Sequence, residues 1–391
     1  MYKSILALAL ILIGFIALAQ NVVRLDNSTI SARALDKKIN QLMKEASVTG
    51  MAIGLFNNGI PVYQKAFGYK NGDTRAPLQM NTNFYGASLS KAVFSVLVMK
   101  LVEEKIIGLD IPLQTYLRKP VYEYGKGKSW NQDYTSLGDE PLYKKITARH
   151  CLTHSTGLAN WRWDEPDQKL HIHFEPGSQY SYSGEGFCYL QFVIEKLTGK
   201  LLNELMQEKI FGPLGMKHSS YTWQPAFEEN YCYGHDKANK PYSKDKDNAP
   251  RAASTLETTA ADYMLFTAAV LQKKILKPET FDTIFKRQLR LRTRFQMVPE
   301  SWKDTTSDND KVLLGYALGW GRLETPFGFG VFKEGHGDGF QHYTILFPGK
   351  NMGIVVMTNS DNGESIFKEL LEFAIKDIYT PWRWQRYVPY K

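Results

Sequence analysis

The sequence predicts a mixed α/β fold of the α+β type. It has an antiparallel β-sheet flanked by helices, with an inserted, mainly helical lobe. Two observations support this prediction. A β-hairpin pattern and an amphipathic helix lie near the start of the chain, and another hairpin and helix lie near its end. Hairpins and helices from opposite ends are most economically combined in one sheet, with the helices packed against it.

The N-terminal elements begin with a predicted helix over residues 31–46. Its apolar side chains recur at helical spacing and form one stripe: Leu35, Ile39, Leu42 and Met43. Residues 51–56 and 60–67 then form two largely apolar runs, separated by Asn57-Asn58-Gly59. Because Asn-Gly is a preferred turn between paired strands, this stretch is predicted to be a β-hairpin.

The C-terminal elements mirror this arrangement. Residues 313–323 and 328–333 are predicted to be strands, and residues 343–347 and 352–358 are predicted to pair as a second hairpin. Residues 365–378 then carry apolar side chains on one side and charged ones on the other, as in an amphipathic helix. Both ends of the chain therefore contribute strands and a helix.

The stretch between these ends is richer in helical patterns, so residues 109–291 or thereabouts are expected to form the helical lobe. The sheet lobe then comprises about 31–108 and 292–380, and residues 20–391 are expected to form one domain. A polar, Gly- and Tyr-rich stretch at 118–145 is a candidate insertion over the cleft between the lobes.

Residues 1–19 have the pattern of a secretory signal peptide. Lys3 is the only charge before about fifteen apolar residues, and Ala17-Leu18-Ala19 matches an Ala-x-Ala cleavage site before Gln20. The apolar core is short for a membrane span, so an uncleaved anchor is the weaker alternative. The mature protein is therefore expected in the periplasm or outside the cell, with no stable membrane span.

The composition indicates a globular protein without a nucleic-acid partner. Hydrophobic residues make up 43% of the chain and aromatic residues 13%, enough to build a large core. The formal net charge is +8, but basic and acidic residues are interleaved, and no nucleic-acid motif is visible. The three cysteines (Cys151, Cys188 and Cys232) lie in or beside apolar stretches, so no disulfide framework is expected.

A candidate nucleophile lies at Ser88. It opens a stretch, 88–102, that is apolar on nearly every face, as in a helix buried inside a protein. Lys91 lies one turn further on the same face, so its amine can touch the serine hydroxyl. Ser88 could simply cap the helix, but a lysine in the first turn opposes the helix dipole. A desolvated lysine has a lowered pKa and can accept the proton of an attacking serine.

The Ser-x-x-Lys spacing is weak evidence by itself, because the chain contains it three times. Ser243 and Lys246 lie in a polar run that is typical of a loop. Ser365 opens a helix, but Lys368 lies on the polar stripe of that helix. Only Ser88 combines a helix start, a neighbouring lysine and apolar surroundings.

Two other kinds of hydrolase are disfavoured. His171-Ile172-His173 could bring two imidazoles to one strand face, but no His-Glu-x-x-His or comparable carboxylate spacing accompanies them. They are expected to be surface structure, and neither a metal nor another cofactor is expected. An α/β-hydrolase is disfavoured because Gly86-Ala87-Ser88-Leu89-Ser90 lacks the final glycine of the nucleophile elbow.

Five motifs carry a resemblance to a known family. They are Ser88-Leu-Ser-Lys91, Leu-Thr-His-Ser-Thr-Gly-Leu at 152–158, Glu-Pro-Gly with Tyr-Ser at 175–183, Pro-Leu-Gly-Met at 213–216 and Gly-His-Gly from 335. In order and spacing the chain resembles the β-lactamase-related serine hydrolases, which include class C β-lactamases, D-alanyl-D-alanine carboxypeptidases and small-ester esterases. The resemblance covers about 31–378 and implies a β-lactamase/transpeptidase-like fold.

The resemblance also implies roles for individual residues. Ser88 would be the nucleophile and Lys91 its proton acceptor, and Tyr182 would pass the proton to the leaving group. His336 falls where the family has Lys or His on the last inner strand, facing the substrate carboxylate or the tyrosine. Backbone N–H groups of Ser88 and Gly339 would hold the oxyanion.

The chain departs from the family pattern at two places. The usual Tyr-Ser-Asn reads Tyr182-Ser183-Gly184, so a side-chain amide that would orient the substrate and lysine is missing, and Gly337-Asp338-Gly339 follows His336. We expect an acyl-transfer site with an altered pocket, acting on a small ester, amide or D-amino peptide, including pieces of cell wall. The alternative is a non-catalytic protein that keeps the fold and binds a wall peptide or another ligand.

Overall fold

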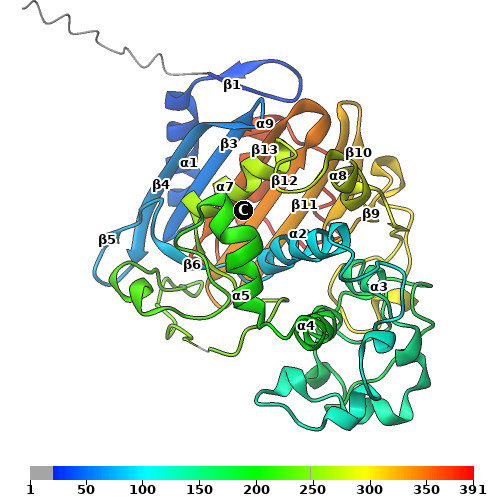
Figure 1. The fold of residues 1–391 in the computed structure, drawn as a ribbon. Coiled ribbons are helices and arrows are strands. Elements are labelled where there is room, and N and C mark those ends of the chain that lie inside the picture. Colours follow the sequence, from blue (N-terminus) through cyan, green and yellow to red (C-terminus); the bar gives the residue numbers. More distant parts are fainter. Residues whose placement is uncertain (1–20, 247) are drawn as a thin grey trace, which may run out of the picture.

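A central antiparallel sheet organises the computed structural model, which describes residues 21–246 and 248–391; the predicted signal peptide lies outside them. Within the described residues this sheet has nine strands in the order β5-β4-β3-β13-β12-β11-β10-β9-β8 (Figure 1). Their bounds are Gly50–Asn57 (β3), Ile60–Asn71 (β4), Ala76–Pro77 (β5), Leu289–Arg290 (β8), Gly315–Tyr316 (β9), Gly321–Thr325 (β10), Gly328–Gly337 (β11), Phe340–Phe347 (β12) and Met352–Thr358 (β13). Two short pairs lie outside it: Val22–Val23 (β1) with Thr29–Ile30 (β2), and Asn83–Tyr85 (β6) with Glu257–Thr259 (β7).

The two ends of the chain meet in the middle of the sheet. β13 from the C-terminal hairpin pairs antiparallel with β3 from the N-terminal hairpin, with Val355 opposite Gly54. Both predicted hairpins form, as β3–β4 and β12–β13. The prediction of one antiparallel sheet built from both ends is therefore confirmed.

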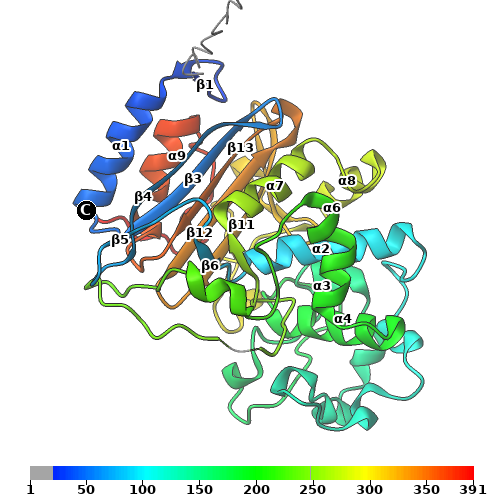
Figure 2. The ribbon, with the colours of Figure 1, turned by 60° about the vertical axis from the view of Figure 1, so that its left-hand side comes forward.

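Helices cover both faces of the sheet. The N- and C-terminal helices α1 (Ala32–Glu45) and α9 (Phe367–Ile375) lie side by side on one face, and α2 (Leu89–Glu103) and α7 (Ala260–Leu271) lie on the other (Figure 2). Because strands covered on both faces have no polar side, every residue of β3 and β13 is buried.

The inserted part of the chain is mainly helical, as expected. It contains α3 (Ala148–Leu152), α4 (Gly184–Thr198), α5 (Leu202–Met206), α6 (Gly212–Leu214) and α8 (Pro278–Phe285). The stretch 118–145 forms a series of single 3₁₀ turns, one of them Trp130–Gln132. The helix α7 was expected in the helical lobe but packs on the sheet, where a side chain at Gly54 would come within 2.4 Å of Met264.

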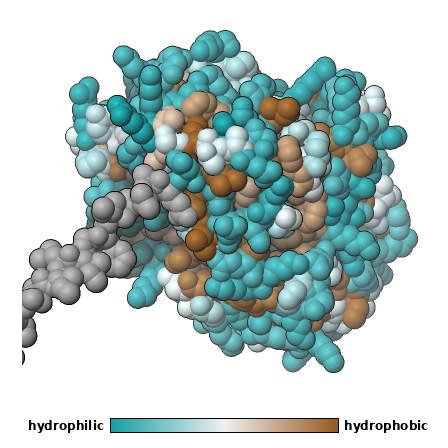
Figure 3. All heavy atoms as spheres, turned by 90° about the horizontal axis from the view of Figure 1, so that it is seen from above, coloured by the Kyte–Doolittle hydropathy of each residue, from teal (hydrophilic) through white to brown (hydrophobic). Residues whose placement is uncertain are grey.

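The face of the molecule seen in Figure 3 is largely hydrophilic. On the face shown in Figure 3, hydrophobic residues form only small groups among hydrophilic ones. The three cysteines are buried and free. In the part of the chain that the structure describes, no helix is both long and apolar enough to cross a membrane.

Candidate active site

Ser88 lies at the junction between a short strand pair and the buried helix α2. Strand β6 pairs with β7, and the N–H of Gly86 donates a 2.6 Å hydrogen bond to the carbonyl of Leu256. Ala87 then takes a left-handed backbone conformation, with φ of 45°, which is unusual for a residue with a side chain. Within the described chain the Ser88 side chain makes no capping hydrogen bond to α2. The Ser88 hydroxyl therefore does not cap the helix, which is the usual structural role of a serine at a helix start.

Lys91 lies beside the Ser88 hydroxyl. Its Nζ is 3.0 Å from Ser88 Oγ and donates a 2.8 Å hydrogen bond to the carbonyl of Ala253. Only 1% of the residue is exposed, and burial lowers the pKa of Lys91 well below its usual range. The positive charge of Lys333 lowers this pKa further. The amine of Lys91 is thus set up as a free base that can take a proton from Ser88.

Tyr182 completes a cluster around these two side chains. Lys91 Nζ lies 4.9 Å from the centre of the Tyr182 ring. The ring stacks on the imidazole of His154, with centroids 4.1 Å apart. Burial raises the pKa of Tyr182, although Lys333 and Ser88 act in the opposite direction, so the phenol keeps its proton at neutral pH.

Lys333 is a site residue that sequence reasoning missed. Its Nζ donates a 3.1 Å hydrogen bond to the Tyr182 hydroxyl and lies 2.6 Å from Oε1 of Glu334. Burial alone would lower the pKa of Lys333, but Glu334 and Tyr182 outweigh it and the pKa is raised. Gln296 donates a 2.7 Å hydrogen bond to the same Glu334 oxygen, which satisfies this buried carboxylate.

A signal for Lys333 was present in the sequence. Lys333 and Glu334 are adjacent charges that follow Val331 and Phe332 in an otherwise apolar strand. Neighbouring residues of a buried strand cannot both reach solvent, so such a pair has to be satisfied inside the protein.

The contact with Tyr182 that was expected of His336 is made by Lys333. Side chains at Gly335 and Gly337 would collide with Gly86 and Tyr85, so these two glycines face the segment that leads from β6 to α2. The His336 side chain alternates with these glycines, and its Nε2 lies 3.3 Å from Glu364 Oε1, while the residue still lines the cavity that contains Ser88. The amine that contacts Tyr182 belongs to Lys333, three residues earlier on β11.

Gly339 is also engaged elsewhere. Its N–H donates a 2.8 Å hydrogen bond to Asp361, so the structure does not offer this group to an oxyanion. Its φ of 73° suits the two-residue turn Asp338-Gly339, which joins the paired Gly337 and Phe340. Gly339 therefore shapes the hairpin at the end of β11.

Gly184 gives room to a tryptophan. A side chain at Gly184 would come within 2.5 Å of the Trp161 ring. The backbone N–H of Gly184 donates a 3.0 Å hydrogen bond to the side-chain oxygen of Asn160. An indole thus lies where the side chain of a residue at 184 would project.

Ser88, Lys91 and Tyr182 line a cavity of about 340 Å³. Its lining includes the predicted catalytic side chains, the newly found carboxylate and several aromatic rings: Tyr85, Ser88, Lys91, Trp130, Trp161, Trp163, Tyr182, Arg251, Glu334 and His336. The structure therefore brings Ser88, Lys91 and Tyr182 together in one cavity.

The other two Ser-x-x-Lys pairs are not arranged in this way. Ser365 donates a 2.6 Å hydrogen bond to the carbonyl of Asn362, while Lys368 pairs with Glu372 at 2.6 Å on the surface. Lys246 pairs with Glu228 at 2.7 Å.

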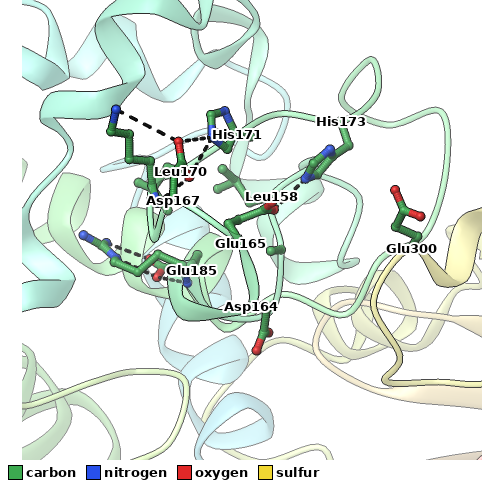
Figure 4. Close-up of polar contacts among 12 residues, drawn as sticks. Leu158, Asp164, Glu165, Asp167, Leu170, His171, His173, Glu185 and Glu300 are labelled. Carbon is green, nitrogen blue, oxygen red and sulfur yellow. Dashed lines mark hydrogen bonds and ion pairs between the residues drawn. The ribbon is translucent and has the colours of Figure 1, made fainter.

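His171 and His173 bind carboxylates of their own loop. Figure 4 shows His171 turned toward Asp167 and His173 toward Glu165; the distances are 3.0 Å and 2.6 Å. In the described part of the chain, no group of three or more His, Cys, Asp or Glu residues could hold a metal ion.

The comparison with protein families defines the class of this protein. Residues 35–375 match the family model described as Beta-lactamase, so the chain belongs to the beta-lactamase family. The resemblance inferred from the five motifs is confirmed. The family and the fold are those of serine hydrolases.

Individual relatives are distant. The chain is 22% identical over 334 residues to "Protein flp" of Staphylococcus aureus (strain MW2), covering 84% of this chain and 63% of that relative. It therefore spans less than two thirds of that relative's length. It is 28% identical over 183 residues to "Lovastatin esterase" of Penicillium rubens, covering 41% of this chain and 45% of the esterase.

A solved structure titled beta-lactamase/D-alanine carboxypeptidase, from Pseudomonas syringae, has the same fold. It superposes with a TM-score of 0.69 at 16% sequence identity and covers 88% of this chain and 98% of that one. The predicted β-lactamase-like fold is thereby confirmed.

Proposed function

We propose that the protein is an exported serine hydrolase that forms an acyl-serine intermediate at Ser88. The observation that carries the proposal is the 3.0 Å contact between Ser88 Oγ and the buried amine of Lys91, whose pKa is lowered. A free amine in that position can remove the serine proton during attack on a carbonyl. Export rests on the signal pattern in residues 1–19.

In the first step, Ser88 Oγ attacks the carbonyl carbon of the substrate and its proton moves to Lys91 Nζ. The negative charge that develops on the carbonyl oxygen needs two N–H donors close by. One is the N–H of Ser88 at the start of α2, where the helix dipole favours negative charge.

The second donor follows from the hairpin at the end of β11. Gly337 and Phe340 close a two-residue turn, where the flanking residues exchange hydrogen bonds. Because hydrogen bonds alternate along an antiparallel ladder, the N–H of His336 points away from β12. On that side β10 pairs with β11 only as far as Phe332, which leaves the edge at His336 open to the cavity. We therefore assign the second oxyanion donor to the backbone of His336, in place of Gly339.

In the second step the leaving group departs with a proton. Tyr182 lies close to both Lys91 and Lys333, so its phenol can give its proton to the leaving oxygen or nitrogen and regain one from Lys91. The charged Lys333 stabilises the phenolate that forms briefly. Water then releases the acyl group from Ser88 through the same groups in reverse.

The expected substrate is a small ester, amide or D-amino peptide. The names of the relatives, an esterase and a D-alanine carboxypeptidase, support this range of acyl compounds. An ester, an amide and a β-lactam would all leave an acyl group on the same serine. The substrate class therefore has to be identified from the adduct that each compound forms.

Intact-mass spectrometry tests the proposal. The protein is incubated separately with a fluorophosphonate, a penicillin and a p-nitrophenyl ester, and the mass of any covalent adduct is recorded. We expect a stoichiometric fluorophosphonate adduct and turnover of the ester. A protein that binds these compounds without any adduct or turnover would be the non-catalytic alternative.

A further inference from the structure

Three tryptophans form one wall of the cavity that contains Ser88. Trp161 and Trp163 stack with centroids 5.2 Å apart and planes at 20°, and Trp130 meets them nearly at right angles at 5.5 Å and 4.8 Å. Trp130 comes from the 3₁₀ turn Trp130–Gln132 in the stretch 118–145. The candidate insertion thus supplies an aromatic side chain to the cavity.

The wall is held rigidly. Arg162, between the two stacked rings in sequence, makes two 2.9 Å hydrogen bonds to the fully buried Glu185 and one of 2.8 Å to the carbonyl of Asp133. The Arg162 guanidinium also lies 5.3 Å from the Trp130 ring centre. An aromatic surface fixed before binding loses little conformational entropy when a ligand arrives.

The wall also explains the departure at position 184. The Trp161 ring occupies the space next to Gly184 and would collide with any side chain there. Meanwhile 51% of Trp163 is exposed, a large fraction for an indole. A large exposed apolar ring in a cavity marks a ligand surface more often than a packing defect.

We propose that Trp130, Trp161 and Trp163 form an aromatic subsite that binds a planar apolar group of the substrate. Perpendicular and stacked indoles offer such a group both edge and face contacts. The inference rests on the proposed function for the reaction, but binding to the subsite does not require catalysis.

Kinetics with matched neutral esters test the subsite. Methyl 2-naphthoate carries an aromatic acyl group, 2-naphthyl acetate an aromatic alcohol, and ethyl acetate neither. For at least one naphthyl ester we expect Trp163→Ala to lower kcat/KM by about three- to tenfold more than for ethyl acetate, and Trp163→Phe to restore most of it. Trp223→Ala is the control, because Trp223 packs on Phe227 and Tyr231 outside the cavity. Equal losses for all three esters would overturn the subsite.

Binding without catalysis separates this inference from the proposed function. In the Ser88→Ala background, calorimetry with 2-naphthamide, cyclohexanecarboxamide and N-acetylglucosamine should show tightest binding of the planar amide. Trp163→Ala or Gly184→Asn, which displaces the Trp161 ring, should weaken that binding severalfold. If 2-naphthamide binds in this way although the unmodified protein hydrolyses none of the three esters, the proposed function fails and the subsite stands. Tighter binding of the sugar, or unchanged binding of 2-naphthamide in both variants, overturns the subsite.

Discussion

The Nζ of Lys333 lies 3.1 Å from the hydroxyl of Tyr182, and the Nζ of a second lysine, Lys91, lies 4.9 Å from the centre of the same ring. The pKa of Lys333 is raised by Glu334, while the pKa of Lys91 is lowered by burial and by Lys333 itself. The surroundings therefore favour the charged form of Lys333 and the neutral form of Lys91. In the proposed mechanism this difference drives the proton from Ser88 toward Lys91.

Removing Lys333 is expected to move the pH dependence of catalysis. When the positive charge of Lys333 is removed, the protonated form of Lys91 becomes more stable, so the pKa of Lys91 rises. The acid limb of kcat/KM for a neutral ester should shift to higher pH in Lys333→Met. Lys368→Met, which changes a surface lysine paired with Glu372, should leave the limb in place. An unshifted limb in Lys333→Met would show that the two lysines are not electrostatically coupled.

Lys91 is expected to lower the stability of the folded protein. Its pKa is lower in the folded than in the unfolded chain, so between these two pKa values the unfolded state binds more protons and stability rises with pH. The cost is roughly 1.4 kcal/mol for each unit by which the pKa is lowered. Lys91→Met should therefore raise the melting temperature below about pH 10, with a gain that fades above the unfolded pKa of about 10.4. Thermal unfolding of both proteins from pH 6 to pH 11 checks this; a less stable variant across the whole range contradicts it.

Lys91 and Tyr182 are expected to act as a unit. Lys91→Ala and Tyr182→Phe should each lower kcat by roughly 10²–10⁴-fold, and the double variant should lose much less than the product of the two factors. Tyr182→Phe keeps the ring that stacks on His154 and removes only the hydroxyl. The double-variant cycle is measured with a neutral ester. Losses that simply multiply would mean that the two groups do not move the same proton.

His336 is expected to matter for stability through its side chain and for catalysis only through its backbone. Burial lowers the pKa of His336, but Glu364 outweighs this and the pKa is raised. Because the folded pKa exceeds the unfolded one of about 6.5, the His336–Glu364 pair stabilises the fold below that pH and loses its effect as pH rises through the folded pKa. His336→Gln should lower the melting temperature more at pH 5.5 than at pH 9, as should Glu364→Gln. A change in the alkaline limb for anionic esters alone would instead place the imidazole on the substrate.

The main strands and helices could be predicted because hairpin turns and apolar periodicity are local signals. The contact between Ser88 and Lys91 could be predicted because the apolar residues next to them indicate that α2 is buried. Lys333 could not be recognised by spacing from the Gly-His-Gly motif, which drew the prediction to His336. Strand alternation decides which of these side chains faces Tyr182, and that depends on the register of β11 against β12. The contribution of the 118–145 stretch to the cavity could not be predicted, because the position of Trp130 depends on long-range packing against Trp161.

The most direct test of the central claim is to locate the covalent adduct. The protein is labelled with a fluorophosphonate at several pH values, digested, and mapped by mass spectrometry, in parallel with Ser88→Ala, Ser243→Ala and Ser365→Ala. We predict a single labelled peptide containing Ser88, no adduct in Ser88→Ala, undiminished labelling in the other two variants, and a labelling rate that falls as Lys91 becomes protonated at low pH. Labelling of a different serine, or of Ser88→Ala at the rate of the unmodified protein, would contradict the assignment of Ser88 as the nucleophile.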